Sequence, residues 1–113
     1  MKLTVQSRHV TLTQAIAKHV RDRLTAALDQ HQKRIARVQV MLHDSNGPRG
    51  GKDQMCNVRV HLTDGRVLNH KRTDRDMYAN ISLIADKLKR RLGKCLRRDT
   101  DRRKRIGRGQ TNL

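Results

Sequence analysis

The feature that most constrains the fold is a stretch of helical periodicity between Asp76 and Lys94. Its apolar residues are four, three, four, four and three positions apart, which places them on one face of an α-helix. They are Met77, Ile81, Ile84, Leu88, Leu92 and Cys95. A helix with such a face is stable only when that face is buried, so the rest of the chain must supply a layer that covers it.

The other side of this helix is strongly basic. Lys87, Arg91, Lys94 and Arg98 recur at intervals of four, three and four along a strip beside the apolar face, and Arg90 and Arg97 lie further round. The whole chain of 113 residues carries a net charge of +17, with ten acidic residues that are all Asp. Such an excess is typical of proteins that bind a polyanion, either nucleic acid or an anionic membrane surface.

The N-terminal part predicts a strand, a helix and a second strand. Leu3 and Val5 alternate with polar residues over 2–7, as in a short strand. Thr11 or Thr13 can cap a helix at about 13–30. After Arg34 the period changes to two, which indicates a strand with one buried face.

Two further strands and a hairpin are expected before the basic helix. The segment 45–53 contains four Gly and Pro residues and predicts a loop. Alternation resumes around Val58 and Val60, Asp64-Gly65 is a strong hairpin signal, and 66–72 is the returning strand. Asp74 or Asp76 then caps the basic helix.

The predicted order is therefore β-α-β-β-β-α, an α+β fold with two layers. The first two strands should be parallel and the later pairs antiparallel, which gives a four-stranded mixed sheet with both helices on one face. We assign residues 1–98 to this domain. Beyond Arg98 the apolar pattern ends, and the basic segment 99–113 is expected to be a disordered tail.

Several classes of function are disfavoured by the motifs. The sequence shows no apolar run of about 18–20 residues that could span a bilayer and no signal-peptide core, which favours a cytoplasmic protein without membrane association. Cys56 and Cys95 form no CxxC pair, and the histidines have no zinc spacing, so no metal or other cofactor is expected. No catalytic motif is evident, and we expect neither enzyme activity nor a small-molecule substrate.

Two segments resemble a known family. DMYANI (76–81), followed by DKLKRRLGK (86–94), is similar to the second-helix signature of the bacterial ribosome hibernation-promoting factors, also called ribosome-associated inhibitors or sigma modulation proteins. LTQAIAKHVRDRL (12–24) is similar to the matching part of the first helix. The resemblance covers roughly residues 1–98 and corresponds to the short form of the family. It implies a fold similar to that of double-stranded RNA-binding domains.

The resemblance also implies a function. Family members bind the small ribosomal subunit and its rRNA in the channel for mRNA and tRNA, and block translation by occlusion under stress or in stationary phase. On matching positions, the residues that contact RNA are Lys87, Arg90 and Lys94. Helical geometry adds Arg91 and Arg98 as further candidates for RNA contact. The long form's dimerisation domain is absent from this sequence, and we expect a monomer when the protein is free.

Other basic residues are candidates for additional RNA contacts: Arg37, Arg59 and Arg66 on the outer sheet face, and Arg102, Arg103, Lys104 and Arg105 in the tail. For the sheet face, an ordinary polar solvent-exposed surface is an equal alternative. For the whole chain, the alternative function is a general basic RNA- or DNA-binding architectural protein without a specific ribosomal site.

Overall fold

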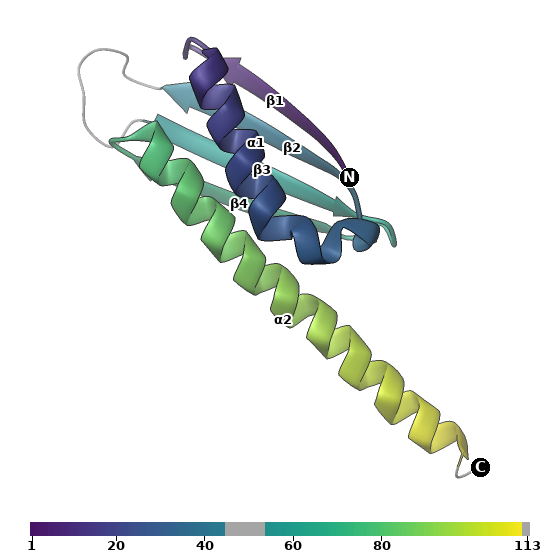
Figure 1. Ribbon diagram of the computed structural model, residues 1–113. Helices are drawn as coiled ribbons and strands as arrows, with labels where there is room; N and C mark the ends of the chain where they lie inside the picture. Colours follow the sequence, from purple (N-terminus) through teal and green to yellow (C-terminus); the bar gives the residue numbers. More distant parts are fainter. Residues whose placement is uncertain (45–53, 112–113) are drawn as a thin grey trace.

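Four strands and two helices follow one another in the predicted order. The computed structural model describes residues 1–44 and 54–111, and their side chains up to residue 98. The elements are β1 (Lys2–Arg8), α1 (Gln14–Leu28), the 3-10 segment η1 (Asp29–Arg34), β2 (Ile35–Asp44), β3 (Gln54–Leu62), β4 (Val67–Asp74) and α2 (Met77–Thr111) (Figure 1). The predicted α+β class and β-α-β-β-β-α order are confirmed. The loop predicted at 45–53 lies outside the described residues.

The sheet has the order β1-β2-β3-β4 and is mixed. The strand–helix–strand unit makes β1 and β2 parallel, with Leu3 opposite Val38, whereas β3 and β4 continue the sheet in antiparallel fashion. The predicted hairpin turn joins β3 to β4. Gly65 adopts a φ of +95° there, a region that glycine enters without the clash of a Cβ atom.

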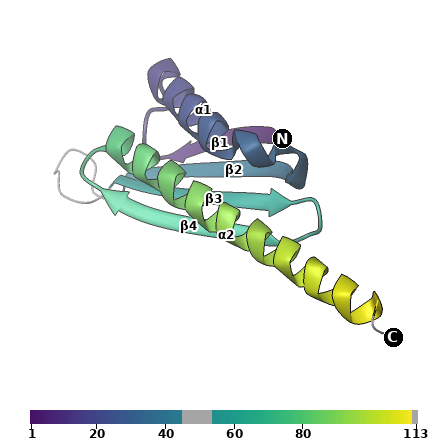
Figure 2. The ribbon, with the colours of Figure 1, turned by 60° about the horizontal axis from the view of Figure 1, so that its bottom comes forward.

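Both helices cover the same face of the sheet, as predicted, and leave the opposite face without a second layer (Figure 2). The buried positions of β2 and β3 alternate along each strand and meet the apolar faces of α1 and α2. The core includes Val20, Leu24 and Leu28 from α1, Val38, Val40 and Leu42 from β2, Cys56, Val58, Val60 and Leu62 from β3, and Ile81, Ile84, Leu88 and Leu92 from α2. Burial of this aliphatic set is the main stabilising contribution, since each fully buried Leu or Val contributes about 1.5–3 kcal/mol.

The first helix begins where one of its two candidate caps predicts. Thr13 is the N-cap, and its side-chain oxygen accepts a hydrogen bond from the backbone N–H of Ile16 at 3.1 Å. The α-helix ends at Leu28, and the chain tightens into η1 before β2 begins. The single helix predicted over 13–30 is therefore shorter and is followed by a separate element.

The long helix α2 differs from the expectation in two respects. Leu96, which is 8% exposed, closes the buried face at its C-terminal end, whereas Cys95 is only partly buried. The placement of Cys95 in the buried stripe was thus wrong by one residue. The backbone also remains helical to Thr111, past Arg98, where the sequence predicts a change. The boundary at residue 98 and the disorder of the tail stay predictions.

Candidate RNA interface

Four basic side chains form one edge of α2, which we call the basic flank: Lys87, Arg91, Lys94 and Arg98. All four are exposed. With a rise of 1.5 Å per residue, they extend over about 16 Å of helix axis. Arg91 defines the direction of the flank, because its guanidinium donates a hydrogen bond of 2.8 Å to the backbone carbonyl of Asn69 in β4. The basic flank therefore lies on the β4 side of the helix.

His70 lies close to the positive charges of this flank. It lies in β4 under α2 and is partly buried, and burial lowers its pKa. The positive charges of Lys87 and Arg91 lower that pKa further. The lowered pKa favours a neutral imidazole beneath the basic flank.

Arg90 does not lie on the basic flank, although it was predicted to bind the same partner. It lines a groove of about 670 Å³ on the other side of α2, toward α1 and η1. The groove is also lined by Lys89, Arg97, Gln30 and His31. Lys89 was missed by the sequence reasoning, because helical spacing shows which residues are exposed but not which neighbouring element they face.

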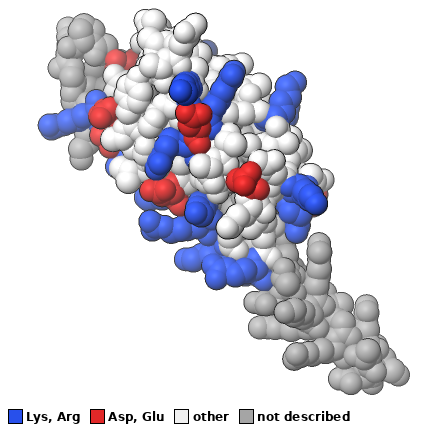
Figure 3. All heavy atoms as spheres, viewed as in Figure 1, with Lys and Arg blue, Asp and Glu red and all other residues white. Residues whose placement is uncertain are grey.

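The single acidic residue of α2 with a described side chain is positioned away from the basic flank. Between residues 77 and 98, α2 has seven Lys or Arg and a single acid, Asp86. Asp86 faces α1, where its carboxylate lies 3.9 Å from Arg23. In Figure 3, blue side chains gather along the lower edge of the described surface, and red groups are interspersed above them. A polyanion approaching the basic flank therefore meets no carboxylate of α2 in the part with described side chains.

The start of α2 is fixed by two aspartates. The Asp76 side chain accepts a hydrogen bond of 3.0 Å from the backbone N–H of Tyr78, which identifies Asp76 as the cap of the helix. Asp74 lies just before it and accepts hydrogen bonds from the backbone N–H groups of Arg75 and Asp76. Both candidates named from the sequence thus take part, and only Asp76 caps the helix.

Asn80 holds the first turns of α2 against the sheet. Its amide is fully buried and donates hydrogen bonds of 2.9 Å to the carbonyls of Gln54 in β3 and Arg72 in β4. Its Oδ1 accepts a bond of 3.1 Å from the Arg72 guanidinium, which also bonds Asp74 at 2.7 Å. A buried amide with three partners fixes the helix to two strands, and the position of the basic flank follows from it.

Tyr78 and His19 join α2 to α1 at the same end. Their rings meet edge to face with centroids 5.1 Å apart, and the His19 imidazole lies 3.1 Å from the Ser82 hydroxyl. This ring contact gives Tyr78 a packing role between the two helices.

The remaining predicted contact residues lie in three different places. Arg37 and Arg59 are exposed on the outer sheet face. Arg66 does not lie on that face, contrary to expectation, because its guanidinium bonds Asp64 in the turn and the Cys95 Sγ of α2. The side chains of Arg102, Arg103, Lys104 and Arg105 lie outside the described residues.

Metal and membrane sites are not apparent in the described part of the chain. Within residues 1–44 and 54–98, no three His, Cys or Asp side chains come together as metal ligands would. Burial raises the pKa of the Cys56 thiol to about 12, which keeps it protonated and a poor ligand. Over the same described segments, no helix combines the length and apolarity that crossing a bilayer requires.

Comparison with known proteins decides the family. The family model described as "Sigma 54 modulation protein / S30EA ribosomal protein" matches residues 3–100. This chain belongs to that family. A ribosome hibernation promoting factor of Acinetobacter guillouiae is 30% identical over 99 residues, which cover 83% of this chain and 86% of that protein. The resemblance stated from the two helices is confirmed, and the family is one of ribosome-binding proteins rather than enzymes.

Two solved structures share the fold. A ribosomal subunit interface protein from Coxiella burnetii superposes with a TM-score of 0.71 at 19% identity, covering 83% of this chain and 96% of that one. The N-terminal domain of Protein Y from Thermus thermophilus gives a TM-score of 0.68 at 22% identity, with coverage of 83% and 98%. The family's sheet and two helices are thus present over most of the chain.

Proposed function

We propose that this protein silences ribosomes by occupying the mRNA and tRNA channel of the small ribosomal subunit, where the exposed side of α2 contacts rRNA. The observation that carries the proposal is the basic flank, which is exposed, adjoins no acid of α2 in the described part, and is fixed to the sheet through Arg91 and Asn80. Family membership supplies the ribosome as the partner. No chemical step is needed, because occupation of the channel is itself inhibitory.

Phosphate contacts should dominate the binding energy. The exposed residues of the basic flank offer ammonium and guanidinium groups, which bind phosphate through charge-assisted hydrogen bonds. The interface has no set of exposed aromatics on which bases could stack. Contacts of this kind position a protein on the RNA backbone and respond to its shape more than to its sequence. We further expect the free protein to be a cytoplasmic monomer.

The test is co-sedimentation with purified ribosomes at near-physiological salt, with excess nonspecific RNA duplex as competitor. The full chain should remain with the small subunit in the presence of the duplex. Loss of all binding to the competitor would instead support a general nucleic-acid-binding protein. The same assay at several salt concentrations measures how many phosphates are neutralised, since the log–log slope changes by about 0.7–0.9 per contact.

Charge-reversal variants test whether α2 provides the surface that binds the ribosome. The triple variant Lys87→Glu, Arg90→Glu and Lys94→Glu should lose ribosome retention and keep the wild-type circular dichroism spectrum. A matched triple variant changes Lys18, Arg21 and Lys33, which are exposed on α1 and η1, to Glu. This control alters the net charge equally and should retain most of the binding. Equal loss in both variants would show that overall charge, and not α2, determines binding.

A further inference from the structure

The face of the sheet opposite the helices carries only one sign of charge. Sixteen side chains of β1 to β4 point outward there, as the strand registers show. Five of them are basic, and none is acidic: Lys2, Arg8, Arg37, Arg59 and Lys71. This face lies on the opposite side of the sheet from α2 and its basic flank (Figure 2). An uncovered face of this charge is complementary to a polyanion.

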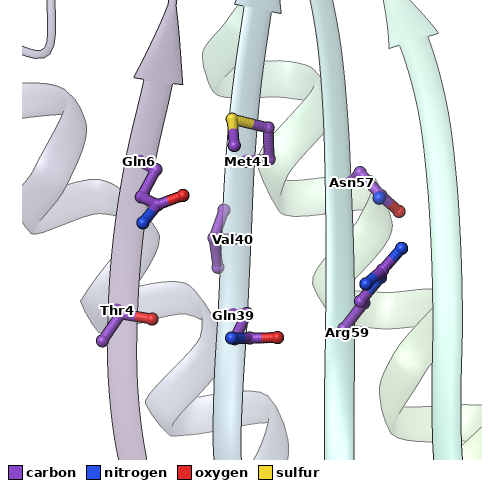
Figure 4. A pocket seen from close by; sticks show the side chains of 7 residues that line it. All are labelled: Thr4, Gln6, Gln39, Val40, Met41, Asn57 and Arg59. Carbon is purple, nitrogen blue, oxygen red and sulfur yellow. The ribbon is translucent and has the colours of Figure 1, made fainter.

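A hollow of about 310 Å³ lies at the centre of this face, across β1, β2 and β3. Figure 4 shows side chains that line it: Thr4 and Gln6 from β1, Gln39 and Met41 from β2, and Asn57 and Arg59 from β3. Its volume is at the lower end for small-molecule sites, which suits one nucleotide better than a larger ligand. The lining combines amides, a hydroxyl, a thioether and one guanidinium.

The amides are arranged for further hydrogen bonds. The Oε1 of Gln39 lies 2.8 Å from the Nε2 of His61, which fixes the orientation of the Gln39 side chain and directs its NH₂ group elsewhere. The Oδ1 of Asn57 is buried and has no hydrogen-bond partner among the described residues. A buried amide oxygen without a partner is unfavourable, so a small rotation of Asn57 toward a donor in the hollow would be stabilising.

We propose that this hollow binds one unpaired RNA nucleotide, with Arg59 against its base or phosphate and the amides of Gln39 and Asn57 at its base edge. Guanidinium planes stack on unpaired bases, and side-chain amides bond their edges, in single-stranded RNA recognition. The inference rests on the proposed function, because ribosomal RNA is the source of the nucleotide. It adds a contact surface on the side of the molecule opposite the basic flank.

The experiment measures the affinity of the full chain for a labelled ten-nucleotide single-stranded RNA by fluorescence anisotropy. Arg59→Gln should weaken binding at least about fivefold, since the loss of one base-stacking contact is of that size or larger. The control is Lys71→Gln, which removes one charge from the same face outside the hollow and should weaken binding about twofold or less. Asn57→Ala should weaken binding without changing the slope of its salt dependence.

Two results would overturn the inference. Equal weakening by Arg59→Gln and Lys71→Gln would show a uniformly charged surface without a nucleotide site, and unchanged binding by Arg59→Gln would exclude the hollow. Ribosome co-sedimentation of the wild type separates this inference from the proposed function. If the wild type remains on ribosomes while Arg59→Gln binds the oligonucleotide normally, only the nucleotide site is refuted.

Discussion

Replacing Asn80 with alanine removes the amide that joins α2 to β3 and β4. The change deletes two donated hydrogen bonds of 2.9 Å, to the carbonyls of Gln54 and Arg72, and one accepted from the Arg72 guanidinium. The guanidinium keeps Asp74 as a partner, and the two carbonyls belong to residues that pair across β3 and β4. The penalty is therefore the loss of three buried hydrogen bonds, each of which contributes about 0.5–1.5 kcal/mol. We therefore expect a loss of about 2–4 kcal/mol in the free energy of unfolding.

Urea unfolding followed by far-ultraviolet circular dichroism measures this loss. The midpoint should shift while the denaturant slope stays constant, because the folded state keeps its buried surface. The matched control is Asn69→Ala, an exposed asparagine of β4, which should change stability by less than about 0.5 kcal/mol. A loss below about 1 kcal/mol for Asn80→Ala would refute the view that this amide fixes the helix to the sheet.

Asn80→Asp provides a second check, with a pH dependence of defined sign. The substitution directs one carboxylate oxygen at two carbonyl oxygens in a fully buried position, while the other faces the Arg72 guanidinium, whose charge is already paired with Asp74. Burial and the two carbonyls therefore disfavour the charged form in the folded state and raise the carboxyl pKa above its unfolded value. Stability relative to wild type should then be greatest at low pH, where the protonated carboxyl can donate. It should be lost as the pH rises through the folded pKa. A variant whose relative stability is independent of pH would contradict this reasoning.

Three further predictions concern the start of α2, the two thiols and the stability at low pH. Asp76→Ala should lower the unfolding free energy by about 1 kcal/mol in the same urea assay, since it removes the helix cap. A thiol-specific disulfide reagent should modify Cys95 in the folded protein but Cys56 only after unfolding, because Cys56 is fully buried with a raised pKa. Side-chain hydrogen bonds from arginines two residues away lower the pKa of Asp64 and Asp74. The contribution of these two carboxylates to stability should be present above about pH 4 and lost as the pH falls through their lowered pKa values. The double variant Asp64→Asn and Asp74→Asn should therefore show a flatter dependence of unfolding free energy on pH in this range.

The strands and helices were predictable where one period dominates. The alternation of Val38, Val40 and Leu42 indicates one face of β2, and all three are buried. The start of β3 was harder to predict. The alternation of apolar and polar residues is clear only from about Val58, although the strand begins at Gln54 and Cys56 is fully buried. A cysteine or a polar residue next to a glycine-rich segment carries little hydrophobic signal, so the boundary depends on pairing with β2.

The basic side of α2 was also predictable, but its division into two surfaces was not. Helical spacing places Lys87 and Arg91 together and Arg90 apart from them, without showing that the first pair faces β4 and Arg90 faces η1. That assignment depends on the tertiary contacts of Arg91 and Asp86. Arg66 illustrates the same limit, since a local pattern placed it on the sheet and its bonds to the turn and α2 direct it to the other side.

Asn80 shows that a residue of a family signature can have a structural role that the sequence alone does not reveal. It belongs to the DMYANI segment that carried the family resemblance, and it occupies a buried position among apolar neighbours. A polar residue at such a position usually conflicts with helical amphipathicity. Its role depends on carbonyls of Gln54 and Arg72, 26 and 8 residues away in sequence, which only the folded sheet brings within reach.

The hydrogen bond from Arg91 to Asn69 has a consequence for self-association. β4 is an edge strand, and the unpaired backbone groups of such strands are templates for strand addition by another molecule. The Arg91 guanidinium occupies one carbonyl of this edge, and the outward Lys71 adds positive charge beside it. Two copies that approach edge to edge would have to displace one arginine each and bring like charges together. The side chain that helps form the basic flank should thus also hinder strand addition at the β4 edge.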